Sequence, residues 1–186
     1  QWTVPQPECC PRIYDTGRWL GWATALLQHA CEVGRYEPEQ TIIDCLTNAG
    51  LNAAAAYSAC SSGVPAWPDY THKQLWLAGL ATELRHPGNS TKYRETRWEL
   101  VSSAISTTYG QWAGDLSWEK VDGQMFNQKT CAACFFQLGF DLACATQAYR
   151  EALAANADRA LQTTIRELNR TRLRLRSALA VLYASQ

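Results

Sequence analysis

The eight cysteines of this 186-residue chain are the feature that most limits what it can fold into. An even number of cysteines is typical of proteins that leave the cell, where thiols are oxidised to disulfides. Sequons begin at Asn89 and Asn169, and with Gln1 as first residue we expect a mature chain whose signal peptide has been removed. We therefore expect a mature, secreted, extracellular protein with four disulfides and with N-glycans at both asparagines.

The cysteines fall into two groups separated by a long stretch of chain. Cys9, Cys10, Cys31, Cys45 and Cys60 come early, and Cys131, Cys134 and Cys144 come late. Both groups have odd numbers of members, so pairing of all eight requires at least one disulfide between the groups. Adjacent cysteines rarely bridge each other, because their Cβ atoms point apart, and we expect Cys9 and Cys10 to have different partners.

The late group also contains a CxxC pair, Cys131 and Cys134, with the spacing of half a zinc site or of a redox motif. A zinc site needs a second half, and the sequence has no other CxxC and no HxxxH. A redox pair normally lies between a strand and a helix, a context that this sequence lacks. Structural disulfides are therefore the favoured interpretation, and we expect no metal and no other cofactor.

The hydrophobic pattern favours helices along the whole chain. Residues 1–12 predict a Pro-rich, extended N-terminal arm held by cysteines. Apolar residues at helical spacing then predict helices over about 15–33, 38–50, 52–60, 71–86 and 91–108, with Gly34 and Gly50 as ends. Residues 61–70 and 110–128 predict loops. Alternating β-branched runs are absent, so the fold class is all-α.

The last part of the chain predicts long helices, because residues 140–186 contain neither Gly nor Pro. A heptad seam over 161–182 indicates a face that packs on the core or on a second copy of the chain; its members are Leu161, Ile165, Leu168, Arg172, Leu175, Leu179 and Leu182. We expect one domain over residues 1–186, a disulfide-stapled multi-helix bundle. A monomer is the first expectation, and a homodimer through the seam is the alternative.

Charge excludes some partners and suggests others. The net charge is +0 and no apolar stretch is long enough to cross a bilayer, so neither nucleic-acid binding nor a membrane span is expected. Residues 150–186 nevertheless carry 7 basic and 3 acidic side chains. Arg159, Arg166, Arg170 and Arg174 form a stripe at helical spacing, which is either a solvated face or a binding site for an acidic partner.

Enzyme motifs are not evident. No histidine precedes an aspartate, and no GxSxG, HExxH, Walker or GxGxxG pattern occurs. His29 lies on an apolar helical face and is interpreted as a packed histidine at the edge of the core. His72, beside Asp69 in a predicted capping turn, is the candidate for acid–base chemistry.

Tryptophans outside the helical pattern are candidates for recognition. Trp67, Trp112 and Trp118 lie in the predicted loops next to Gly, Pro or Asp, where a large ring is harder to bury. Tryptophan combines a large apolar area with a polar N–H group, which suits a binding surface for protein or sugar. We therefore interpret these three residues, together with Arg166, Arg170 and Arg174, as candidate binding residues.

The cysteine-pinned arm, scattered cysteines, sequons and Trp-rich first half, with no enzyme motif, resemble the small cysteine-rich secreted effectors of filamentous plant pathogens. The resemblance implies a stable, protease-resistant binding protein and a role as an extracellular virulence-type factor. We expect recognition of an extracellular protein or a cell-surface glycan through 61–70 and 110–128. The alternatives are an extracellular hydrolase or lyase with a site near His72, and a carrier of a small hydrophobic ligand between helices.

Overall fold

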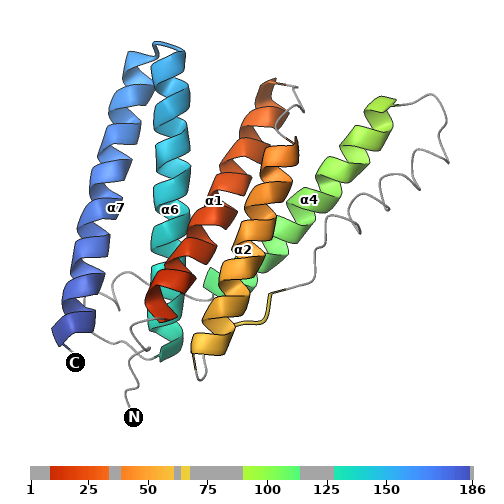
Figure 1. Cartoon of the computed structure of the whole chain (residues 1–186). Helices are drawn as coiled ribbons and strands as arrows, with labels where there is room; N and C mark the ends of the chain where they lie inside the picture. Colours follow the sequence, from red (N-terminus) through yellow and green to blue (C-terminus); the bar gives the residue numbers. More distant parts are fainter. Residues whose placement is uncertain (1–8, 34–38, 61–63, 68–89, 114–127, 185–186) are drawn as a thin grey trace.

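The computed structural model describes residues 9–33, 39–60, 64–67, 90–113 and 128–184. Within these residues the chain forms five helices and no strand, so the all-α fold class is confirmed (Figure 1). The helices are α1 (Cys9–Val33), α2 (Glu39–Ala59), α4 (Ser90–Ala113), α6 (Gln128–Ala154) and α7 (Asp158–Ala184). The helix expected over 71–86 lies outside the described residues.

Helix α1 is the centre of the bundle. It packs on α2 and on α6, which lie on either side of it, while α7 packs on α6 and α4 contacts both α1 and α6 (Figure 1). Gly17 lies against Phe136 and Gly21 lies against Phe140, so α1 and α6 run in parallel. Helices α2 and α7 run antiparallel to their neighbours α1 and α6 (Figure 1).

Glycines allow α1 and α6 to approach each other closely. A Cβ atom on Gly17 would lie 1.9 Å from the backbone oxygen of Phe136, and one on Gly21 would lie 2.5 Å from that of Phe140. From the other side, Gly139 of α6 fits against the backbone of α1 at Tyr14. Small residues four apart on one helix face permit this backbone contact, a packing best documented between membrane helices. Gly17-x-x-x-Gly21 is thus a packing motif of the core.

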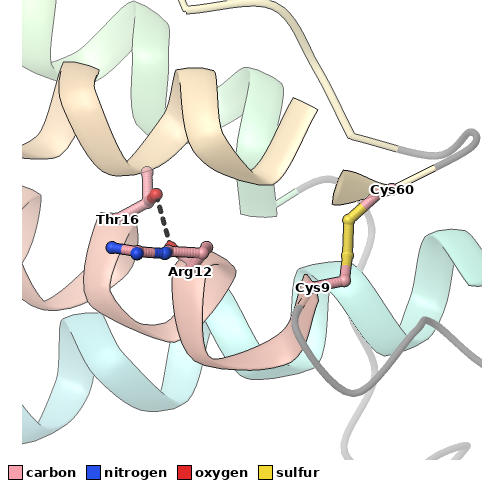
Figure 2. Close-up of a disulfide and its surroundings, with 4 residues drawn as sticks. All are labelled: Cys9, Arg12, Thr16 and Cys60. Carbon is pink, nitrogen blue, oxygen red and sulfur yellow. Dashed lines mark hydrogen bonds between the residues drawn. A yellow bond between two sulfur atoms is a disulfide. The ribbon is translucent and has the colours of Figure 1, made fainter. Parts of the chain in front are cut away.

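A disulfide joins the first turn of α1 to the end of α2. Cys9 and Cys60 are bonded, with Cα atoms 5.5 Å apart, and both side chains are buried (Figure 2). The sequence-based expectation of an extended arm up to residue 12 is therefore wrong for residues 9–12, which are helical. Pro11 fits there because amides in a first helical turn have no intrahelical acceptor.

The next turn of α1 carries a buried hydroxyl that is satisfied locally. Thr16 is fully buried, and its Oγ1 donates a hydrogen bond to the backbone oxygen of Arg12 at 2.8 Å (Figure 2). The Arg12 side chain in turn donates to Asn52 of α2 at 3.3 Å. The Arg12–Asn52 hydrogen bond adds a polar link between α1 and α2.

Helix α2 is continuous, although the sequence predicted a break at Gly50. A Cβ atom at this position would lie 2.9 Å from Nε1 of the Trp67 indole. Gly50 therefore makes room for a ring that packs against the helix backbone, and it does not end the helix. The separate helix expected over 52–60 is the second half of α2.

The C-terminal segment forms two helices with a tight turn between them. Asn156 has φ 52°, and the amides of Asn156 and Ala157 donate to the backbone oxygens of Leu153 at 3.3 Å and Ala152 at 3.0 Å. This is the Schellman pattern, in which asparagine replaces the more common glycine. The first of the two helices also begins earlier than expected, at Gln128, and contains Gly139.

The face of α7 that packs inward differs from the predicted seam. Thr171 and Ala178 are buried, Leu168, Leu175 and Leu179 are half-buried, and Ile165 and Arg172 are exposed. Thr171 can be buried because its hydroxyl donates to the backbone oxygen of Glu167 at 2.9 Å. Much of the apolar seam is therefore covered by the core of the same chain.

Candidate functional site

Two of the tryptophans predicted for recognition belong to the interior. Trp112 is only 3% exposed, and its ring centroid lies 5.6 Å from that of Phe136. Trp67 is half-buried and makes an edge contact with Trp112 at 6.5 Å. The prediction of Trp112 as an exposed binding residue is wrong, because α4 extends through Ala113 where a loop from residue 110 was expected.

Several other predicted site residues lie outside the described residues. These are His72, Asp69, Trp118 and Asn89. The enzyme hypothesis near His72 and the role of Trp118 stay predictions. His29 is described, and it is half-exposed: its Nδ1 lies 3.4 Å from Oε2 of Glu151, which links α1 to α6.

The arginine stripe lies on α7, but not all of its members face outward. Arg159, Arg166 and Arg170 are exposed, and Arg170 pairs with Glu167 at 3.0 Å on the same helix. Arg174 is half-buried instead, and its positive charge partly opposes the rise that burial produces in the pKa of Asp141 on α6. Arg174 thus interacts electrostatically with α6, and its role in binding an external partner stays a prediction.

The exposed face of α7 combines positive charge with apolar side chains. Leu173 is 62% exposed and Ile165 is 41% exposed, and the sequence had assigned no role to Leu173. A hollow of about 540 Å³ opens on this helix, and its described lining consists of Asn169, Arg172, Leu173, Leu175, Arg176 and Leu179. The predicted glycosylation residue Asn169 is exposed and lies on the edge of this hollow.

A second hollow, of about 200 Å³, lies between α1 and α6. Its lining consists of Arg18, Trp22, Leu142, Ala143, Thr146, Gln147 and Arg150. We call it the α1–α6 groove. Sequence reasoning missed it, because the two arginines come from distant parts of the chain and only the packing of α1 against α6 brings them together.

The aromatic wall of the groove is held in place by a second tryptophan. Trp22 stacks on Trp19, with ring centroids 5.4 Å apart and planes inclined by 20°. The guanidinium carbon of Arg18 lies 5.4 Å from the centroid of the Trp19 ring, a cation–π contact. The three side chains form a layered stack on the surface of α1.

A buried polar chain links α4, α6 and α7. The hydroxyl of Tyr109 donates to Oε1 of Gln137 at 2.7 Å, and Nε2 of Gln137 donates to Oδ1 of Asp141 at 2.7 Å. Burial raises the pKa of Asp141, and the hydrogen bond from Gln137 and the charge of Arg174 only partly oppose this. Burial likewise raises the pKa of Tyr109. These hydrogen bonds satisfy polar groups between packed helices, and the charges of Arg174 and Glu167 on α7 also act on Asp141.

The expectation that all eight cysteines form disulfides is wrong for three of them. Cys31 is an exposed thiol, and burial raises the pKa of both Cys45 and Cys144 to about 12. The Cys144 thiol donates to the backbone oxygen of Gly21 at 3.4 Å, whereas Cys31 lies about 15 Å farther along α1. Bonded cysteines need Cα atoms within about 7 Å, so these two positions cannot meet.

No group of three or more metal-ligating side chains occurs among the residues that the structure describes. Among the same residues, no helix is long and apolar enough to cross a membrane. No family model, no curated protein and no solved structure matches the chain.

Proposed function

We propose that this chain is a secreted, disulfide-stapled helical binding protein that recognises an acidic protein partner outside cells through the exposed face of α7. The observation that supports the proposal most directly is the hollow on α7. Its described lining combines the basic residues Arg172 and Arg176 with the apolar residues Leu173, Leu175 and Leu179. An apolar centre flanked by arginines is typical of protein-binding surfaces.

Charge supports an acidic partner. The segment from residue 150 onward has an excess of basic over acidic side chains, 7 against 3, and Arg159, Arg166, Arg172 and Arg176 are exposed. Such a field raises the rate at which an oppositely charged surface associates. The exposed Leu173 and Ile165 favour a protein over a glycan, because a glycan alone would not need apolar contacts of this kind.

The Cys9–Cys60 disulfide supports a role outside cells, where such bonds persist. We include in the proposal a role as an effector-type virulence factor, as the resemblance of the sequence implies. Proteins of that class act as stable binding proteins in the extracellular space, and a stapled bundle with a basic face suits this task.

Photo-crosslinking tests the binding face. A benzophenone amino acid replaces Leu173 in one protein and Leu51 of α2, which is 65% exposed, in the control. Each is irradiated with a mixture of secreted proteins. We expect a salt-sensitive adduct with an acidic protein from position 173 alone, and its loss in the double variant Arg172→Glu, Arg176→Glu. Equal adducts from both positions, or adducts that contain only glycan, would contradict the proposal.

Asn169 gives a further control, because a glycan there would cover the edge of the hollow. The variant Asn169→Gln should give at least as much adduct as the unchanged protein when both come from a glycosylating host. A loss of the adduct in Asn169→Gln would mean that the glycan itself is recognised.

A further inference from the structure

We propose that the α1–α6 groove is a binding site for a small carboxylate that carries one ring. It shares no residue with the hollow on α7, so this inference goes beyond the proposed protein recognition and does not depend on it. Its support comes from the charge, the aromatic wall and the size of the groove.

The lining of the groove, as far as the described residues form it, carries positive charge and no carboxylate. Arg18 and Arg150 are the two charged residues of the described lining. Arg18 has an exposed ion pair with Asp15 at 3.4 Å, which is worth little in water, and its cation–π contact with Trp19 does not use its N–H donors. No ion pair within the described residues involves Arg150. Two arginines that line one hollow can bind a carboxylate through paired N–H donors of their guanidinium groups.

The other polar groups of the groove are already engaged. The Thr146 hydroxyl donates to the backbone oxygen of Leu142 at 2.7 Å, and Nε2 of Gln147 donates to Oε1 of Glu151 at 3.1 Å. Glu151 is further held by its contact with His29. The arginines are therefore the main donors open to a ligand, which selects for an anion.

The wall formed by Trp22 selects for a ring. Its indole is fixed by stacking on Trp19, so a ligand that stacks on it loses little side-chain freedom of the protein. Leu142 and Ala143 add apolar surface. The volume of about 200 Å³ is below the range of about 300–1,000 Å³ typical of drug-sized ligands, so the groove has room for one ring.

A singly charged carboxylate suits this groove better than a phosphate. The apolar wall removes water from the ligand, and removing water from a doubly charged anion costs more. The ring can belong to an aromatic acid or to a uronic acid, because both can lie flat on an indole. The test separates these two sources.

The test is calorimetric titration of the whole protein with sodium benzoate and with sodium glucuronate. Benzamide and glucose serve as their neutral counterparts, and inorganic phosphate serves as an anion without a ring. We expect one of the two acids to bind, with its neutral counterpart and phosphate at least tenfold weaker. An NMR nuclear Overhauser effect between ligand ring protons and the Trp22 indole should accompany binding.

Matched arginine variants locate the site. Arg150→Gln and Arg18→Gln should each weaken binding of the acid at least tenfold, the loss expected for a charge-assisted hydrogen-bond pair, and Arg159→Gln on the exposed face of α7 should leave it unchanged. All three side chains are exposed, so equal unfolding midpoints will show that the fold is intact.

Four results would overturn the inference: no binding of either acid, equal binding of the neutral counterpart, equal binding of phosphate, or an equal loss in Arg159→Gln. Because the crosslink from position 173 does not involve the groove, it should persist in saturating acid. Failure of the groove and failure of the α7 proposal are thus distinguishable.

Discussion

Replacement of Gly17 by alanine tests whether backbone contact between α1 and α6 organises the fold. The added Cβ atom would lie 1.9 Å from the Phe136 oxygen, while ordinary contacts begin at 3.4 Å. The blocking atom is backbone and cannot rotate away, so the helices must separate by about 1.5 Å, which forfeits much of the dispersion energy along the interface. After a gain of about 1 kcal/mol in helix propensity, we expect a net loss of about 3 kcal/mol in unfolding free energy.

The chain offers a matched control for this substitution. Gly110 is an exposed glycine in α4 with nothing within 4 Å of the position of its Cβ atom. Gly110→Ala should therefore stabilise the protein by about 0.5 to 1 kcal/mol. Urea titrations followed by circular dichroism at 222 nm measure both changes in unfolding free energy, compared at equal dependence of that free energy on urea concentration. If the two substitutions shift the midpoint in the same direction, the close approach of α1 and α6 is refuted.

Three further changes test the disulfide, the buried tryptophan and the buried carboxyl. Joint replacement of Cys9 and Cys60 by serine should cost about 4 kcal/mol in unfolding free energy, because the bond closes a loop with a sequence separation of 51 residues. Alkylation of the native protein should modify the exposed thiol of Cys31. An unmodified Cys31 would contradict its exposure. Trp112→Ala should cost about 3 to 5 kcal/mol in unfolding free energy, because it removes a buried ring. Trp112→Phe should cost far less, because phenylalanine keeps a ring and lacks the buried N–H that has no acceptor among the described residues. Urea titration compares the two variants, and equal losses would refute this reasoning. Burial raises the pKa of Asp141, so the contribution of this carboxyl to stability is complete below the ordinary pKa of 3.8 and is lost as the pH rises through the pKa of the folded state. Asp141→Asn should therefore raise the melting temperature at pH 7 and leave it unchanged near pH 3. No difference at pH 7 would count against the buried carboxylate.

The helices could be predicted from the sequence, but some of their ends could not. Periodic apolar residues are a local signal, and α4 and α7 occur where this signal places them. Glycine was taken as a helix end at Gly50, yet tertiary packing of Trp67 overrides its low helix propensity. The turn at Asn156 lacks both glycine and proline, so its only local signals are an asparagine and the acidic Asp158 that follows.

The assignment of side chains to core or surface was less predictable. Trp112 was interpreted as exposed because Gly110 precedes it, but one more turn of α4 carries the ring into the core beside Phe136. Heptad counting likewise places Ile165 and Arg172 in a seam, although both are exposed on α7. The later seam members Leu175 and Leu179 do pack against the core, but the fully buried positions are Thr171 and Ala178. A small and a polar side chain escape a count of large apolar residues, so the heptad pattern identifies only part of the inward face.

The groove could not be predicted from any local pattern, because its charge is produced by tertiary structure. Arg18 lies near the middle of α1 and Arg150 lies in the last two turns of α6, and each by itself is an ordinary exposed arginine. They share a hollow only because α1 and α6 run in parallel, an arrangement that the glycine contacts at Gly17 and Gly21 make possible. The consequence links stability to binding: a substitution that separates these helices should weaken acid binding in the groove even where every lining residue is unchanged.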